Sequence, residues 1–192
     1  MSGPVAHRAT RSPSDRPSWT VILGTIAFVL TVPGTVVVLA PYWLTGWRAG
    51  PPLFGTRLTR WLGGVLFLVG LPVFVDFVVR FVREGLGTPA PIAPTRHLVV
   101  GGPYRLVRNP GYLAVLALLI GQALMLGRTS LLVYAAAVAV GFHAFVVLYE
   151  EPTLRRTFGT EFEAYSRTTP RWIPRLSWGR RALEDRGRGS AS

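Results

Sequence analysis

The sequence predicts an all-α integral membrane protein with about four transmembrane helices and short cytosolic or interfacial helices near the C-terminus. Three observations carry this prediction. Of the 192 residues, 49% are apolar and only 16% are charged, against about 25% charged residues in an ordinary soluble domain. The charges are clustered, so long stretches carry none. All 21 basic residues are arginines, and they gather between those stretches.

Four stretches lack charged residues: 17–47, 61–75, 109–127 and 129–149. A helix needs about 20 apolar residues to cross about 30 Å of hydrocarbon. The first and last stretches meet that length, the second reaches it by continuing through Asp76, and the third is slightly short. A soluble bundle of buried helices is the alternative, but it would need more polar surface than these stretches leave. We expect spans at about 20–44, 58–82, 110–127 and 129–150.

The arginines predict the topology of these spans. With four spans, the N-terminal tail, the middle loop and the C-terminal region lie on one side, with three, five and nine arginines, and the other side has four. Positive residues stay on the cytoplasmic side of a membrane. We expect a cytoplasmic (inner) membrane protein whose termini and active site face the cytosol. The net charge of +12 then reflects topology and contact with the anionic lipid bilayer, and no nucleic-acid partner is expected.

A single membrane domain is expected over residues 19–177. The flanking segments 1–18 and 178–192 are rich in Ser, Gly, Pro and Arg, a composition typical of disordered tails. The first apolar run is longer than that of a cleaved signal peptide.

The region after the fourth span predicts two short helices. Leu154, Phe158, Phe162 and Tyr165 recur at helical spacing, which would place an apolar stripe on the membrane surface or over the middle loop. Thr160 and Glu163 follow Gly159 in the pattern of a capping box, so a second helix is expected to begin there.

Missing residue types exclude several chemistries. The chain has no cysteine and no lysine, which excludes disulfides, cysteine-based zinc sites, cysteine nucleophiles, Schiff-base lysines and lysine-dependent phosphate loops. His143 stands in the fourth span without a second histidine at ligand spacing, so no metal site is expected.

The middle loop ends in a segment with a Gly-Gly turn, two tyrosines and two arginines, read as Leu98-Val-Val-Gly-Gly-Pro-Tyr-Arg-Leu-Val-Arg-Asn-Pro-Gly-Tyr112. Such residues suit an anionic group and a planar ring. Because the tight turn at 127–130 makes the third and fourth spans antiparallel neighbours, Arg108 should lie level with Glu150 and Glu151. Two acids at a helix C-terminus oppose the helix dipole and need a compensating cation. A zwitterion with an added cation, such as S-adenosylmethionine, fits this combination.

The same residues carry a resemblance to a known family. Its parts are Gly102-Pro-Tyr-Arg-x-x-Arg-Asn-Pro-x-Tyr112, an apolar hairpin, Glu150-Glu151, Phe158-Gly-x-x-Phe-x-x-Tyr165 and Arg171-x-Ile-Pro174. In this order they resemble the isoprenylcysteine carboxyl methyltransferase and phospholipid methyltransferase superfamily, over about residues 60–175.

The resemblance implies a membrane enzyme that binds S-adenosylmethionine in a cytosol-facing pocket and transfers its methyl group in line to a membrane-embedded or hydrophobic acceptor, either isoprenylcysteine-carboxylate-like or a lipid. The expected cofactor-binding residues are Leu98, Val99, Gly102, Tyr104, Arg105, Arg108, Asn109, Pro110, Tyr112, His143, Glu150 and Glu151. Of these, Tyr104, Arg105 and His143 are included as neighbours of the others. The expected catalytic residues are Arg108, Glu151 and Arg171, with Arg171 orienting the substrate.

One departure bears on proton transfer. Asn109 stands where the family commonly has histidine, and asparagine keeps hydrogen bonding but does not titrate near pH 7. A carboxylate acceptor would need no base, whereas an amine would need one, with His143, Glu150 or Asp76 as local candidates. The acceptor therefore stays open among prenylated thiol acids, phospholipid amines, isoprenoids and small hydrophobic compounds.

Two other functions fit parts of the sequence. One is a membrane reductase of sterol-reductase-like architecture, which would retain a dinucleotide in place of S-adenosylmethionine. The other is a non-catalytic scaffold or permease-like protein, although transport usually places polar groups near the bilayer midplane. No obligate protein partner is predicted.

Overall fold

The computed structural model describes residues 19–83, 98 and 100–174, in which helices are the only regular elements. The first runs from α1 (Trp19–Gly34) through the π-helical turn η2 (Thr35–Leu39) into α2 (Ala40–Thr45). After the 3-10 turn η3 (Leu53–Gly55) comes α3 (Leu58–Arg83). The remaining elements are η4 (Gly102–Arg105), α4 (Pro110–Leu126), α5 (Thr129–Phe145), η5 (Val146–Glu150), α6 (Glu151–Phe158) and α7 (Thr160–Thr168). The expected tails lie outside the described residues.

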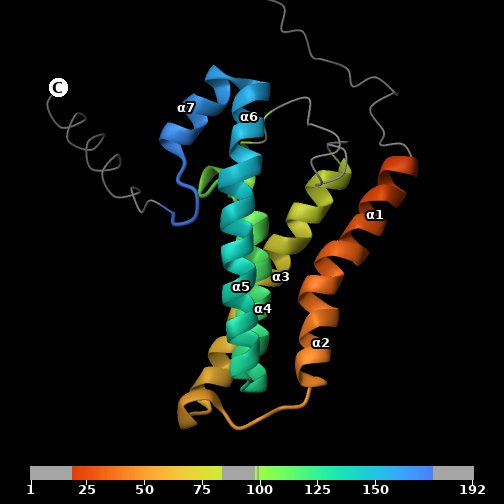
Figure 1. Cartoon of the computed structure of the whole chain (residues 1–192), viewed down its shortest axis with the longest axis vertical. Coiled ribbons are helices and arrows are strands. Elements are labelled where there is room, and N and C mark those ends of the chain that lie inside the picture. The colour runs from red at the N-terminus through yellow and green to blue at the C-terminus, as the bar shows by residue number, and fades with distance from the viewer. Residues whose placement is uncertain (1–18, 84–97, 99, 175–192) are drawn as a thin grey trace, which may run out of the picture.

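The helix α4 is the centre of the bundle, and its buried residues include Leu118, Leu119 and Ala123. Figure 1 shows α4 beside both α3 and α5, with α1 leaning away from α4 and α5 toward its N-terminal end. Glycines let α3 and α4 approach closely. A Cβ at Gly63 would lie 2.7 Å from the carbonyl oxygen of Gly121, whereas one at Gly64 would meet nothing within 4 Å. Small residues of this kind allow membrane helices to pack backbone to backbone.

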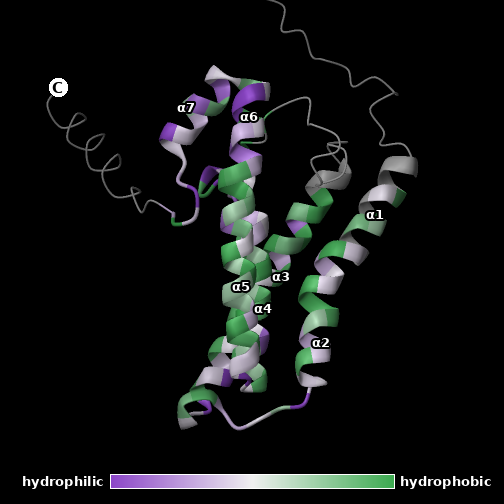
Figure 2. Cartoon of the chain, viewed as in Figure 1, coloured by the Kyte–Doolittle hydropathy of each residue, from purple (hydrophilic) through white to green (hydrophobic). Residues whose placement is uncertain are grey.

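Within the part of the chain that the structure describes, three helical segments are long and apolar enough to cross a membrane: Ile26–Thr45, Leu58–Val79 and Thr129–Phe158. The helix α4 has 17 residues, or about 25 Å at 1.5 Å per residue, so the expected third span is slightly short. Figure 2 shows hydrophobic residues along the middle of the long helices and hydrophilic residues concentrated on α6 and α7. This is the surface of an integral membrane protein, because the exposed apolar side chains need a lipid environment.

The first span is held to the others by two polar contacts. The Gln122 amide donates a hydrogen bond to the Val37 carbonyl at 3.0 Å, and the Tyr134 hydroxyl donates one to the Val36 carbonyl at 3.1 Å. Both carbonyls belong to the π-helical turn η2, which Pro41 follows. Proline has no N–H, so it leaves a carbonyl of the preceding turn without its backbone donor. The side chains of α4 and α5 supply donors to this turn.

The helix of the fourth span does not end at Glu150, where the sequence analysis expected it to end. It continues through η5 into α6, as far as Phe158. The π-helical turn precedes Pro152, and such turns re-form the hydrogen-bond ladder where one donor is missing. The argument that two carboxylates oppose a helix C-terminal dipole is therefore wrong, since both lie within a continuous helix.

The helices α6 and α7 are the two expected short helices, separated by Gly159 at φ +49°. The capping box is wrong: Thr160 is the first helical residue, and Gly159 caps α7 without a side-chain hydrogen bond. Phe162 of α7 is only 1% exposed. Its burial folds α7 back beside α6, and the chain then returns toward the start of α4 (Figure 1).

Candidate active site

The segment before α4 is fastened to the returning C-terminal segment. The Arg108 N–H donates to the carbonyl of Pro170 at 2.9 Å, and the Asn109 side-chain amide donates to the carbonyl of Arg171 at 3.3 Å. Asn109 is buried and precedes Pro110, which begins α4 because a first helical residue needs no N–H partner. The polar side chain thus joins two segments about 60 residues apart in sequence.

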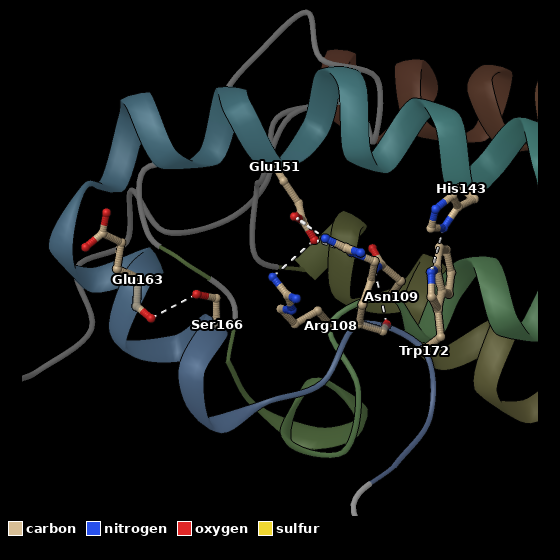
Figure 3. Close-up of polar contacts among 8 residues, drawn as sticks. Arg108, Asn109, His143, Glu151, Glu163, Ser166 and Trp172 are labelled. Carbon is tan, nitrogen blue, oxygen red and sulfur yellow. Dashed lines mark hydrogen bonds and ion pairs between the residues drawn. The ribbon is translucent and has the colours of Figure 1, made fainter.

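Glu151 lies between two arginines. Its Oε1 is 3.1 Å from an Arg108 guanidinium nitrogen. The Arg171 Nε–H and NH2 groups donate to its two oxygens at 2.7 and 2.8 Å, which makes a bidentate pair. Figure 3 shows Arg108 and Glu151 pointing toward each other from the segment before α4 and from the start of α6. Bidentate pairs between an arginine and a carboxylate are among the strongest charge-assisted contacts in proteins.

The two arginines respond differently to this shared carboxylate. Burial lowers the pKa of Arg108 below its usual value, although the Glu151 charge opposes that shift. The hydrogen bonds to Glu151 raise the pKa of the more exposed Arg171. The Arg108 Nε is buried without a hydrogen-bond partner. A largely buried cation with an unused donor is suited to an additional anionic group.

Glu150 faces a different neighbour. The Tyr112 hydroxyl donates to its Oε2 at 2.9 Å. The Tyr112 ring packs against Phe142, with centroids 4.7 Å apart, and more distantly against Trp172. The two adjacent acids therefore have different surroundings. Arginines neutralise the charge of Glu151, whereas Glu150 accepts a hydrogen bond from a neutral phenol.

Two cavities meet at these residues. The polar pocket, of about 600 Å³ out to its open mouth, lies among η4, η5, α6 and α7. It is lined by Leu98, Tyr104, Arg108, Asn109, Val146, Glu150, Glu151, Leu154, Phe162 and Tyr165. The Tyr165 hydroxyl donates to the Tyr104 carbonyl at 2.7 Å, and burial raises the pKa of Tyr165 to about 12.

The apolar pocket, of about 730 Å³ measured in the same way, lies among α1, α3, α4 and α5. Its lining is Phe28, Val32, Pro33, Val36, Phe74, Phe77, Tyr104, Arg108, Asn109, Gly111, Tyr112, Val115, Phe142 and Glu150. Tyr104, Arg108, Asn109 and Glu150 line both pockets and form the shared wall between them.

Most of the expected site residues come together here, but not all. Leu98, Tyr104, Arg108, Asn109, Glu150 and Glu151 line the polar pocket, Tyr112 lines the apolar pocket, and Arg171 joins through Glu151. Gly102, Arg105, Pro110 and His143 line neither pocket, and Val99 lies outside the described residues.

The three candidate bases, His143, Asp76 and Glu150, differ in their position relative to the pockets. The His143 Nδ1 accepts the Trp172 indole N–H at 3.1 Å, as Figure 3 shows, and this occupies one ring nitrogen. Asp76 lines neither pocket, whereas Glu150 lines both. Within the described residues, no three metal-ligating side chains gather in one place.

Other lining residues were not identified from the sequence. Phe162 and Tyr165 were recognised as a helical stripe, and their spacing could have indicated that the stripe covers the loop. The aromatic residues of the apolar pocket, Phe28, Phe74 and Phe142, carry no comparable signal, because apolar residues surround each of them in sequence.

Comparison with known proteins agrees with the resemblance. A family model described as phospholipid methyltransferase matches residues 58–161. Two curated relatives, from Oryza sativa subsp. indica and subsp. japonica, are both named probable protein-S-isoprenylcysteine O-methyltransferase. Each is 35% identical over 77 residues, which is 40% of this chain and 40% of the relative. The matched segment thus spans about two fifths of those relatives. No solved structure gives a significant match. The match over more than half of the chain identifies this membrane protein as a member of the phospholipid methyltransferase family.

Proposed function

We propose that this protein is an S-adenosylmethionine-dependent methyltransferase that acts on a hydrophobic, lipid-like acceptor. The observation that carries the proposal is the pair of cavities, one polar and one apolar, that meet at Tyr104, Arg108, Asn109 and Glu150. A two-substrate reaction needs donor and acceptor held against each other. Membership of a methyltransferase family indicates which group is transferred.

The polar pocket suits the methyl donor by its charges. Arg108 would hold a carboxylate, and its buried Nε has a donor to spare. Glu150 and Glu151 would face the ammonium and sulfonium charges. When bound, S-adenosylmethionine supplies a methyl group already activated on sulfur. The protein then needs to align the reactants and keep water out, and the buried Phe162 and the C-terminal segment across Arg108 serve that purpose.

The apolar pocket suits the hydrocarbon chain of the acceptor, whose polar end would reach the shared wall. Two polar ends are compatible with that wall. A carboxylate, as in the substrate that the rice relatives' name implies, would arrive ionised and would need no base. An amine, as in a phospholipid headgroup, would give its proton to Glu150, which lines both pockets, unlike His143 and Asp76.

The experiment begins with binding. Calorimetry of the full chain in lipid nanodiscs should detect S-adenosylmethionine, and Arg108→Ala should weaken binding at least tenfold, as expected for loss of a charge-assisted contact. Arg167→Ala, on the exposed side of α7, is the matched control. Equal affinities for both variants and the unchanged protein would contradict the assignment of the site.

Turnover then identifies the acceptor. The protein is incubated with methyl-labelled S-adenosylmethionine and either an S-farnesylated cysteine derivative or phosphatidylethanolamine vesicles. Label in the prenylcysteine ester indicates the carboxylate acceptor, and label in the phospholipid headgroup indicates the amine. Binding of a nicotinamide dinucleotide in place of S-adenosylmethionine would favour the reductase, and binding of neither would favour the scaffold.

The proposed orientation places the polar pocket and both termini in the cytosol. Because the chain has no cysteine, single cysteines report topology directly. Thr168 ends α7 and Thr56 lies just before α3, and both are exposed. The helix α7 and the start of α3 lie at opposite ends of the bundle (Figure 1). In intact cells, a membrane-impermeant maleimide should label Thr56→Cys and spare Thr168→Cys. The reverse pattern would overturn the orientation.

A further inference from the structure

The first membrane span takes part in the apolar pocket although it lies outside the segment that defines the family. The family match begins at residue 58, whereas Phe28, Val32, Pro33 and Val36 line the pocket. Phe28, Val32 and Val36 follow at intervals of four residues, so they share one face of the helix. That face extends over about 12 Å at 1.5 Å per residue.

The position of this face depends on the turn that follows it. Pro41 has no N–H to give to the carbonyl four or five residues before it, which is Val37 or Val36. In hydrocarbon an unsatisfied carbonyl is costly, and these two oxygens receive the Gln122 and Tyr134 side chains. The two donors come from different helices, α4 and α5, and therefore fix both the rotation and the height of the first span.

We propose that α1 is the specificity wall of the acceptor pocket, with Phe28, Val32 and Val36 selecting the hydrocarbon chain and Gln122 and Tyr134 acting as positioning residues for that wall. The inference rests on the proposed function for the identity of the ligand. Two helices of the family segment, α3 and α4, supply the opposite wall, so a change in α1 alone alters chain selection without altering the charged groups around Glu151.

The opposite face of the same helix provides a matched control. Val38 faces a separate apolar groove, shared with Trp47, Met125 and Gln122, and is 42% exposed, similar to Val32 at 48%. A tryptophan at position 32 would enter the acceptor pocket, and one at position 38 would not. The two substitutions add the same bulk to the same helix.

The test measures pocket occupancy without turnover. The full chain in nanodiscs is photolabelled with a farnesyl-length isoprenoid alcohol carrying a diazirine, and the labelled peptides are mapped by mass spectrometry. Label is expected on α1 and on the α3 segment around Phe74. Val32→Trp should reduce it about fivefold or more, as overpacking predicts, whereas Val38→Trp should leave it within twofold. Val32→Ala, which enlarges the pocket, should admit a geranylgeranyl-length probe more readily.

The positioning residues are tested by the same labelling with S-adenosylmethionine affinity measured in parallel. Gln122→Leu and Tyr134→Phe should each reduce labelling about threefold, and together about tenfold, from the usual strength of hydrogen bonds in membranes. Cofactor affinity should stay unchanged. Tyr42→Phe, whose ring is exposed on α2, is the control and should leave labelling unaltered.

The outcomes separate the two proposals. Equal labelling in Val32→Trp and Val38→Trp, or labelling insensitive to both positioning variants, overturns the specificity wall while leaving the methyltransferase proposal in place. Position-dependent labelling by a protein that does not bind S-adenosylmethionine supports the wall and overturns the proposed function. A loss of cofactor affinity in Gln122→Leu equal to its loss of labelling would indicate general unfolding and overturn the positioning role.

Discussion

The two pockets share one wall but are built in different ways. The polar pocket is lined by polar and apolar residues from short segments, and one of its carboxylates, Glu151, is held by two arginines. The apolar pocket is formed by long helices whose side chains are mostly aliphatic or aromatic. The first depends on specific charged partners, whereas the second depends on shape, which several residues determine jointly.

This difference has a functional consequence. A methyl donor common to many enzymes can be bound by a conserved kind of charge arrangement, while acceptors differ mainly in their hydrocarbon part. Placing the two in separate cavities would allow the acceptor pocket to change without disturbing the donor pocket. Substitutions on the two sides of the shared wall should therefore have separable effects on cofactor and acceptor binding.

The largest effect is expected at the centre of the polar pocket. Glu151→Gln leaves Arg108 and Arg171 without their shared negative charge, and removing one partner of such a pair costs about 2 kcal/mol or more. The dissociation constant for S-adenosylmethionine should rise about 30-fold, with photolabelling of the apolar pocket unchanged. Glu161→Gln on the exposed surface of α7 is the control. A loss of cofactor affinity together with a loss of photolabelling would show that the two pockets are not independent.

A smaller effect, on the acceptor in place of the cofactor, is expected at Gly111 in the apolar pocket. In Gly111→Ala the new Cβ would lie 2.8 Å from the Phe77 ring, so that ring must move within the apolar pocket. Overpacking of this kind costs about 1–3 kcal/mol. The Michaelis constant for the acceptor should rise about fivefold or more, with cofactor affinity within twofold. Gly141→Ala, where a Cβ meets nothing within 4 Å, should behave like the unchanged protein.

The bidentate pair between Arg171 and Glu151 allows a finer test of cofactor affinity. Arg171→Lys keeps the charge but cannot make two parallel hydrogen bonds to one carboxylate. With Arg171 a third exposed, solvent screening limits the loss to about 1 kcal/mol, or about fivefold in cofactor affinity. Arg167→Lys is the control. An affinity as low as that of Glu151→Gln would show that Arg171 itself touches the ligand.

The smallest effect concerns Tyr165 and depends on pH. Tyr165→Phe removes the hydrogen bond to the Tyr104 carbonyl, worth about 1 kcal/mol. Because burial raises the pKa of Tyr165 from 10 to about 12, the stability from its protonated hydroxyl is present below pH 10 and is lost as pH rises through 12. The difference in Tm between the two proteins should shrink over that interval. A constant difference up to pH 12 would contradict this.

The polar pocket was largely predictable because its residues are close together in sequence or carry charge. The segment from Leu98 to Asn109 contributes four of its lining residues, and the turn at 127–130 brings Glu150 and Glu151 back to the same level. The pairing of Arg171 with Glu151 was not predictable from spacing, since it depends on how α7 folds back at Gly159. The continuation of the helix past Pro152 was also missed, because a proline indicates a helix boundary unless a π-helical turn precedes it.

The apolar pocket could not be predicted residue by residue. Phe28 and Val32 line the cavity and Leu23 and Ile26 of the same helix do not, although Val32 and Ile26 are about equally exposed. Lipid and pocket are equally apolar, so hydrophobic periodicity does not distinguish the two faces. Gln122 and Tyr134 are polar residues within spans, and such residues indicate contacts between helices. The sequence analysis did not use that signal.

The central claim is that the methyl donor occupies the polar pocket and leaves the apolar pocket to the acceptor. A crystal structure of the full chain with S-adenosylhomocysteine tests it most directly. The account predicts ligand density between η4 and α6, with a carboxylate at Arg108 and the thioether turned toward the shared wall at Glu150. Density among Phe28, Phe74 and Phe142 of the apolar pocket, or none at either site at saturating ligand, would contradict it.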